Sequence, residues 1–325
     1  MPHHIQLSEK IQKILCCPIC QTNLKPYEEN YQCQNPECSF SFPTKHGIPI
    51  LINEVSSVFS IKDFINERDT FFNLSYTENP IKQQLRKLIP DISKNVKAKT
   101  NYKKYAELLL AQSEKPIVLV IGGSILGEGM ESITSHPSIE LVESDISFGP
   151  RTHVICDAHN IPFKNNSFDG VIVQAVLEHV IDPWQCVEEI HRVIKEGGLV
   201  YAETPFIQQV HGGCYDFTRF TYLGHRRLFR SFVEIESGAA CGPGMALAWS
   251  YQYFFLSFAL PKLVKSIVVT FAKLTSFYLK YIDYLIINNP KALDAASAVY
   301  FMGRKQQGFV LSDKELIKLY KGNFR

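Results

Sequence analysis

The sequence has little net charge, no internal repeat and no low-complexity tract. Its formal net charge is only +2 over 325 residues, which gives no general electrostatic reason to expect a nucleic-acid partner. The first ten residues carry His3, His4 and Glu9 where an export signal needs a basic start and an apolar core, so export is not expected. What is left is an ordinary globular composition, 46% hydrophobic and 20% charged, with the length for roughly two domains.

A long apolar run is also lacking, although one segment comes near it. Residues 237–261 contain no charged side chain, but the segment opens with Gly238, Gly242, Pro243 and Gly244. Only about 16 residues of helix-compatible sequence remain, against the ~20 that a bilayer core requires. We therefore expect no membrane-spanning helix here.

Nine cysteines are present, and they do not have the pattern of a disulfide framework. Five of them are scattered, at positions 16, 156, 186, 214 and 241. Scattered cysteines are typical of a reducing compartment. The expected location is therefore cytoplasmic, with peripheral attachment to a membrane left open.

The other four cysteines form two pairs, and these are Cys17, Cys20, Cys33 and Cys38. Two thiol pairs on a short hairpin can close tetrahedrally on one Zn²⁺, whose binding would also help so small a module to fold. The alternatives are four reduced structural cysteines without a metal, or a ligand set in which Cys16 or His46 replaces one thiol. Residues 14–52 resemble the small zinc-ribbon proteins that activate methyltransferases as separate partners. The resemblance implies a structural or docking role, because a closed four-thiolate site leaves no coordination position for a substrate.

Seven short apolar segments predict strands of an α/β sheet: 117–121, 139–142, 152–155, 170–174, 199–203, 232–236 and 298–302. A helix is predicted from Pro183, capped by Asp182 and continuing past Ile194 until Gly197 and Gly198 stop it. The order of these elements is typical of a twisted sheet with crossover helices.

Glycines follow the first strand and an acidic residue follows the second, as in nucleotide-binding sheets. Gly122, Gly123 and Gly127 would let the backbone approach a ligand, and Asp145 could accept hydrogen bonds from both ribose hydroxyls. Gly122-x-Ser124-x-x-Gly127 also approximates a dinucleotide fingerprint, so a nicotinamide-dependent enzyme is the competing interpretation.

Three later motifs favour another family. Residues 156–163 with 168–180, the turn at 192–199, and residues 298–305 resemble the class I S-adenosylmethionine-dependent methyltransferases. The resemblance implies a Rossmann-like seven-stranded sheet closed by an antiparallel last strand, with S-adenosylmethionine as the cofactor. It also implies that Asp157 faces the adenine amino group. The cofactor-binding residues expected on this basis are Gly122, Gly123, Gly127, Asp145, Asp157, Ala158 and Gln174.

The predicted organisation is a zinc ribbon (1–54), a helical connector (55–113), a methyltransferase domain (114–310) and a C-terminal tail (311–325). The catalytic domain would contain a helical insertion over 245–292. The connector is expected to be helical because apolar residues recur among polar ones, at Phe59, Phe64, Phe71, Phe72, Leu85, Leu88, Leu108 and Leu109.

Acceptor chemistry is expected in the loops after the fourth and fifth strands. His179 or His211 could take a proton from a hydroxyl, Arg219 could hold a phosphate or carboxylate, and Asp216 could orient either group. Each residue also has a structural alternative: His179 could be a strand-end histidine, and Asp216 with Arg219 could be an ion pair that fixes the loop.

The acceptor itself is left open between several classes. A small-molecule or glycan-pathway intermediate is the leading hypothesis, since the net charge is small. The alternatives are RNA, gripped by the ribbon and the basic stretch 82–104, and a non-catalytic protein with a methyltransferase fold. The amphipathic segment 245–290 is expected to pack over the sheet or form a homodimer face, with peripheral membrane contact as its alternative.

Overall fold

The computed structural model describes residues 7–66, 89–258 and 261–322, without the side chains of residues 262 and 263. Part of the predicted helical connector, including Phe71, Phe72, Leu85 and Leu88, lies outside these residues, as does 82–88 of the basic stretch. Of the connector, the described part contains α2 (Ile61–Ile65) and α4 (Ala98–Leu110).

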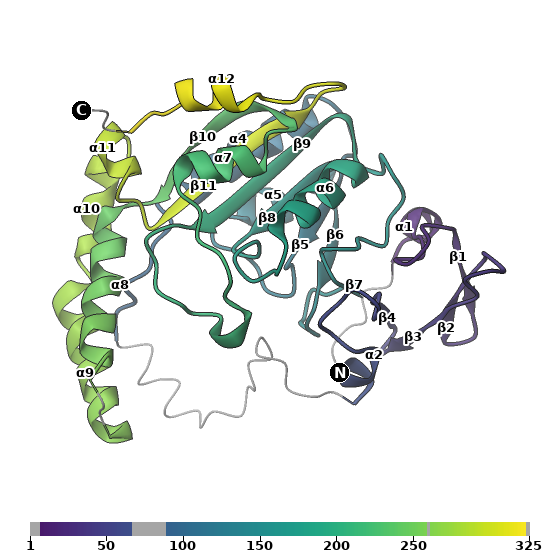
Figure 1. Ribbon diagram of the computed structural model, residues 1–325, viewed down its shortest axis with the longest axis horizontal. Coiled ribbons are helices and arrows are strands. Elements are labelled where there is room, and N and C mark those ends of the chain that lie inside the picture. The colour runs from purple at the N-terminus through teal and green to yellow at the C-terminus, as the bar shows by residue number, and fades with distance from the viewer. Residues whose placement is uncertain (1–6, 67–88, 259–260, 323–325) are drawn as a thin grey trace.

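A mixed sheet forms the centre of the molecule (Figure 1). All seven segments predicted as strands form strands: β5 (Ile117–Ile121), β6 (Glu140–Asp145), β7 (Val154–Cys156), β8 (Phe168–Gln174), β9 (Ile194–Pro205), β10 (Phe232–Cys241) and β11 (Ala298–Lys305). Their spatial order is β7-β6-β5-β8-β9-β11-β10. The strands from β7 to β9 pair in parallel, whereas β11 lies antiparallel to both β9 and β10. The parallel strands therefore end at one edge, after β5, β6, β7 and β8.

The sheet is larger than the seven strands predicted, because the N-terminal module extends it to eleven. The module adds β1 (Leu24–Tyr27), β2 (Asn30–Cys33), β3 (Ser41–Lys45) and β4 (Ile48–Leu51). Strand β4 pairs in parallel with β7, Ile50 opposite Ile155. The pairing covers the edge of β7 and buries Ile50, Leu51 and Ile52 completely.

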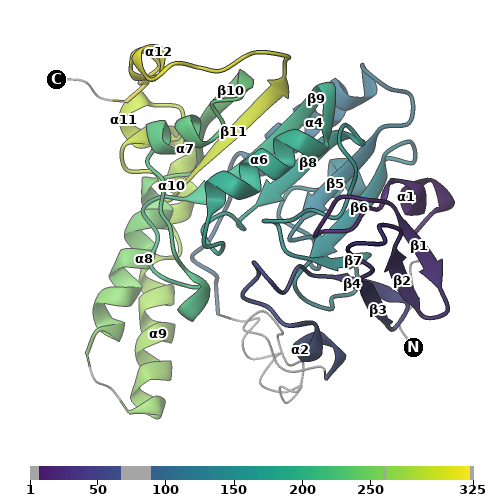
Figure 2. The same cartoon turned by 45° about the vertical axis from the view of Figure 1, so that its right-hand side comes forward.

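Helices cover both faces of the sheet, and alternate residues of each strand supply the two cores. Val118 and Val120 of β5 pack toward α4, while Leu119 packs with α6 (Pro183–Val193) on the opposite face. Figure 2 shows α6 and α7 (Tyr222–Leu228) on that second face. The shorter helices are α1 (Glu9–Ile14), α5 (Glu131–Thr134) and α12 (Asp313–Lys318).

Helix α6 begins as predicted but ends earlier. Asp182 caps it through hydrogen bonds to two backbone N–H groups, and Pro183 occupies its first turn. The helix ends at Val193, and β9 starts directly at Ile194, so the predicted extension to Gly197 is wrong. Ile194 is the first residue of β9 and is fully buried. It therefore packs into the core from the strand, and not from a further turn of the helix.

The segment between β10 and β11 is helical, with α8 (Pro243–Leu256), α9 (Lys262–Ser276), α10 (Leu279–Ile286) and α11 (Pro290–Leu293). Figures 1 and 2 show α8 and α9 as a projecting arm beside the sheet. We refer to α8, α9 and α10 together as the helical arm. Buried Asp283 links α10 to the start of α8, because its carboxylate accepts hydrogen bonds from the N–H groups of Gly244 (2.7 Å) and Met245 (3.0 Å). None of the helices in the described ranges is both long and apolar enough to span a bilayer.

Candidate functional site

The turn after β5 lies close to the end of β6 and requires glycine at its first position. Gly122 has φ +76°, and a Cβ there would lie 2.4 Å from the Val176 side chain. The N–H groups of Gly122 and Gly123 both donate to the Ser144 carbonyl, at 2.9 and 3.0 Å. This fixes the turn against the end of β6, where Asp145 stands.

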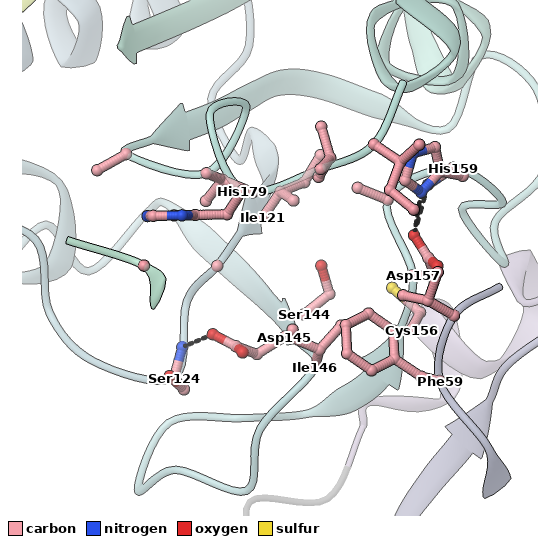
Figure 3. Close-up of a pocket in the computed structure, with 18 of the residues that line it drawn as sticks. Phe59, Ile121, Ser124, Ser144, Asp145, Ile146, Cys156, Asp157, His159 and His179 are labelled. Carbon is pink, nitrogen blue, oxygen red and sulfur yellow. Dashed lines mark hydrogen bonds and ion pairs between the residues drawn. The ribbon is translucent and has the colours of Figure 1, made fainter. Parts of the chain in front are cut away.

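Asp145 points to the glycine turn, as Figure 3 shows. Its carboxylate accepts a hydrogen bond of 3.0 Å from the Ser124 N–H. Burial raises the pKa of Asp145, and the hydrogen bonds from Ser124 oppose that shift. The Asp145 carboxylate also lines the cavity described below, where it can face a ligand.

Asp157 stands one strand further along, after β7, and is almost completely buried. One of its carboxylate oxygens contacts His159 Nδ1 at 2.5 Å, and the other accepts a hydrogen bond of 2.6 Å from the Ser57 hydroxyl. Burial alone would raise the pKa of this carboxyl, but the contacts with His159 and Ser57 hold it below its usual value. The backbone N–H of His159 also donates to Asp157, at 3.0 Å, so the ionised carboxylate already holds three donors.

Asp145, Asp157 and Gly122 line one cavity of about 430 Å³, together with Ala158. The N-terminal segment also contributes to its wall, through Val58 and Phe59. Phe59 stacks on Tyr215 with ring centroids 5.7 Å apart, and Figure 3 shows its ring beside Asp145 and Asp157. The sequence analysis missed this contribution, because no motif marks residues 57–59 and only the β4–β7 pairing brings them to the cavity.

Two of the predicted cofactor residues face a second, adjoining cavity of about 380 Å³. Gly127 and Gln174 line it, and a Cβ on Gly127 would lie 2.0 Å from the Gln174 side-chain oxygen. The Gln174 amide donates to Glu203 at 2.7 Å. Gly122 borders both cavities, whereas Gly123 is not among the lining residues of either.

The predicted acceptor residues His179 and His211 come together. Their rings meet edge to face with centroids 4.9 Å apart, and His211 lines both cavities. The Glu178 carboxylate lies beside both rings, 3.7 Å from His179 Nε2 and 3.8 Å from His211 Nε2. Burial would lower the pKa of His211, but the Glu178 carboxylate raises it overall.

Asp216 and Arg219 contact the loop rather than a cavity. The Asp216 carboxylate accepts hydrogen bonds from the backbone N–H groups of His211 (2.8 Å) and Gly212 (3.0 Å) and pairs with Arg219 at 2.5 Å. Arg219 in turn donates to the Gln208 carbonyl at 2.9 Å. Burial would raise the pKa of Asp216, but the Arg219 guanidinium holds it far below its usual range. These contacts favour the loop-fixing alternative, and direct roles in catalysis stay predictions.

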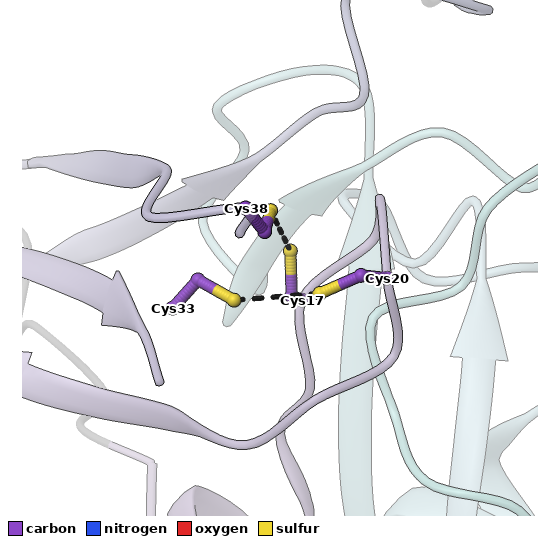
Figure 4. A group of neighbouring side chains, drawn as sticks. All are labelled: Cys17, Cys20, Cys33 and Cys38. Carbon is purple, nitrogen blue, oxygen red and sulfur yellow. Dashed lines mark hydrogen bonds between the residues drawn. The ribbon is translucent and has the colours of Figure 1, made fainter. Parts of the chain in front are cut away.

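The four paired cysteines lie together at the start of the N-terminal module (Figure 4), and these are Cys17, Cys20, Cys33 and Cys38. Their sulfur atoms all lie within 4.8 Å of one another, with Cys17–Cys38 at 3.8 Å and Cys20–Cys33 at 3.4 Å. Four thiolates around one Zn²⁺ at about 2.3 Å would be about 3.8 Å apart, so the cluster fits that ion.

Residues 130–202 match a family model described as a methyltransferase domain. This segment is similar to methyltransferase domains. The match contains three of the residues that line the first cavity and that the sequence analysis proposed for the cofactor, Asp145, Asp157 and Ala158. It ends at Ala202 in β9, before the loop that bears His211.

The curated relatives match over short segments. A demethylmenaquinone methyltransferase of Lysinibacillus sphaericus is 28% identical over 111 residues, which are 34% of this chain and 37% of that protein. One from Staphylococcus epidermidis is 35% identical over 77 residues, 24% of this chain and 27% of that protein. The chain thus spans about a third of the length of these relatives.

Solved structures are similar at a low level. A Haemonchus contortus phosphoethanolamine N-methyltransferase 2 in complex with S-adenosyl-L-methionine has a TM-score of 0.43 and 17% identity. The similarity covers 82% of this chain and 63% of that one. A TM-score of this size carries no argument about function.

Proposed function

We propose that the protein transfers a methyl group from S-adenosylmethionine to a small-molecule acceptor, as an enzyme of the class that its methyltransferase domain indicates. The observation that carries this proposal is the meeting of Asp145 and Asp157 in one cavity with the Gly122 turn. The two carboxylates stand after neighbouring strands, β6 and β7, where the sugar and the base of one adenosyl group can be held together.

The residues present fit that cofactor. Asp145 places a carboxylate in the wall of the cavity, and carboxylate oxygens are the acceptors that two ribose hydroxyls need. Both lone pairs of Asp157 Oδ1 are taken up by His159, but Oδ2 accepts from Ser57 and has a second lone pair. The carboxylate can therefore accept from an adenine amino group through Oδ2 while it keeps Ser57 and His159. Phe59 offers an aromatic face in the same cavity, against which a purine can pack.

S-adenosylmethionine would supply a methyl group already activated by its sulfonium sulfur. The protein then has to align the acceptor with that methyl group and exclude water. The second cavity adjoins the first at Gly122 and His211, and its wall carries the polar side chains of Asn95, Gln174 and Glu203. We assign this cavity to the acceptor. In the metal-free protein, His179 or His211 would remove the acceptor's proton where the acceptor is a hydroxyl.

We also propose that the cysteine cluster holds a structural Zn²⁺. The ion would offset the cost of burying thiolates, since burial raises the pKa of Cys17. Its role would be to stabilise the hairpins that lead into β4, and through β4 the wall of the cofactor cavity.

The helical arm provides a surface for contact with a lipid bilayer. Large apolar side chains are exposed along it: Phe254, Phe258, Val264, Ile267, Phe271, Leu274, Tyr278, Tyr281, Ile282, Tyr284 and Leu285. The sole acidic residue of α8, α9 and α10, Asp283, is completely buried. An exposed apolar face without acidic groups favours contact with a membrane over packing against the sheet. The vesicle flotation experiment in the Discussion distinguishes membrane binding from a homodimer formed through this face.

Calorimetric titration of the purified protein with S-adenosylmethionine and with NADH tests the proposed activity. We expect binding of S-adenosylmethionine alone, and an Asp145→Ala variant that folds normally but binds it at least about 100-fold more weakly, a loss of about 2.7 kcal/mol. Asp313→Ala, an exposed aspartate on α12, is the matched control and should bind like the wild type. Binding of NADH, or unchanged affinity in Asp145→Ala, would refute the assignment, and a salt-dependent affinity for RNA would favour a nucleic-acid acceptor.

A further inference from the structure

Glu178, His179 and His211 form a cluster that a hydrogen-bonding role does not explain. One ligand atom from each residue lies within 4.8 Å of the other two. Glu178 is completely buried, and no hydrogen bond from the described residues reaches either carboxylate oxygen. A buried carboxylate without donors is unfavourable unless a cation compensates its charge.

The two histidines are oriented by their other ring nitrogens. His179 Nδ1 lies 2.7 Å from the Tyr215 carbonyl oxygen, and His211 Nδ1 lies 3.2 Å from the Gln209 carbonyl oxygen. A carbonyl oxygen only accepts, so each Nδ1 carries the hydrogen. In the neutral rings, each Nε2 is then a lone-pair donor directed toward Glu178. This is the arrangement by which proteins orient histidine ligands of a metal ion.

Without a cation, the Nε2 atoms and the carboxylate would face one another as three acceptors. The two Nε2–Oε1 distances, 3.7 and 3.8 Å, are longer than a hydrogen bond to Glu178. Two imidazoles and a carboxylate around one metal ion at about 2.0–2.2 Å stand about 3.0–3.5 Å apart. The ligand atoms lie within 4.8 Å of one another, and a contraction of the cluster onto one metal ion would satisfy all three groups at once.

We propose that Glu178, His179 and His211 bind a divalent transition-metal ion, such as Zn²⁺ or Mn²⁺, at the junction of the two cavities. Three protein ligands leave coordination positions open, unlike the four-cysteine cluster. His179 lines the first cavity, Glu178 lines the second, and His211 lines both. The open positions would thus face the space where the proposed cofactor and acceptor meet. The location rests on the proposed function, but the metal site itself does not.

Mn²⁺ is the probe that separates this site from the cysteine cluster, because it favours oxygen and nitrogen ligands over thiolates. With the protein first loaded with Zn²⁺ at the cysteines, electron paramagnetic resonance measures how much free Mn²⁺ remains during a titration. We expect one Mn²⁺ bound per chain. Glu178→Gln, His179→Ala and His211→Ala should each weaken its binding at least about tenfold.

His136→Ala is the matched control, since His136 lies after α5 and lines neither cavity. It should bind Mn²⁺ like the wild type, and circular dichroism of every variant shows that it is folded. Two results would overturn the proposal. The first is a wild type that binds no Mn²⁺ while it holds one zinc ion per chain, and the second is Mn²⁺ binding by all three ligand variants that equals that of the wild type. Calorimetry with S-adenosylmethionine on the same samples reports the proposed function separately, so either result can fail alone.

Discussion

The Ser57 hydroxyl donates a hydrogen bond of 2.6 Å to the Asp157 carboxylate, across 100 residues of sequence. It joins the N-terminal module to the cavity lined by Asp145 and Asp157, where we propose that the cofactor binds. The same short segment places Phe59 against Tyr215 in the acceptor loop. The module is therefore part of the proposed site, and not an appendage beside it.

Replacing Ser57 tests this connection. Ser57→Ala should lower the free energy of unfolding by about 1.5–3 kcal/mol, because a buried carboxylate loses a hydrogen-bond donor. The neighbouring Ser56 donates to the neutral amide of Asn160 at an exposed position, so Ser56→Ala should cost less than about 1 kcal/mol. Urea denaturation of the two variants measures the difference, and equal losses would contradict the role given to Ser57.

Removal of the proposed zinc ion should affect the proposed cofactor cavity as well as the N-terminal module. A chelator, or Cys17→Ser with Cys33→Ser, should lower the melting temperature and weaken S-adenosylmethionine at least about tenfold, because β4 and residues 57–59 lose their support. Cys214→Ser is the control, since Cys214 is an exposed cysteine outside the cluster. A metal-free protein with unchanged affinity would show that the ribbon folds independently of the cavity.

The ion pair of Asp157 with His159 predicts a pH dependence of stability. Burial alone would lower the pKa of His159, but the Asp157 carboxylate raises it overall. A raised histidine pKa stabilises the fold below the ordinary histidine value, and this contribution is lost as the pH rises through the raised pKa. The lowered pKa of Asp157 limits stability at low pH. The stability that the Asp157 carboxylate contributes is present above the ordinary aspartate pKa and is lost as the pH falls through the lowered pKa.

Urea denaturation between about pH 5.5 and 9 measures the upper limit. The free energy of unfolding of the wild type should fall as the pH rises past about 6.5, and His159→Gln should remove that part of the dependence. His136→Gln serves as the control and should keep the wild-type profile. A profile of His159→Gln that is parallel to the wild type would contradict the assigned ion pair.

The apolar face of the helical arm should bind membranes. Flotation with vesicles of phosphatidylcholine and phosphatidylglycerol should carry the wild type, while Phe254→Ser combined with Phe258→Ser should reduce the bound fraction several-fold. Phe40→Ser changes an exposed aromatic residue of the N-terminal module and should leave binding unchanged. A wild type that does not float, but runs as a dimer that the same double variant dissociates, would assign the face to self-association instead.

Local patterns identified most of the sheet. The bounds of β5 are those predicted, Ile117–Ile121. A run of five apolar residues is typical of a strand that is buried on both faces, and it is too short for a typical helix. The end of α6 was misplaced because Ile194 fits the apolar face of either a helix or a strand. The cysteine spacing indicated a cluster, and the sulfur atoms do lie together, although the ion remains a proposal.

The sequence by itself determined the strands, the glycine turn at Gly122 and the carboxylates at two strand ends, because each depends on residues that are close together in the chain. Only the tertiary structure decided that β4 joins the sheet beside β7, that Ser57 reaches Asp157, and that Glu178 and His179 meet His211. These contacts join segments that no shared periodicity or motif connects. Burial of apolar surface and pairing of strand edges in the complete fold fix their geometry.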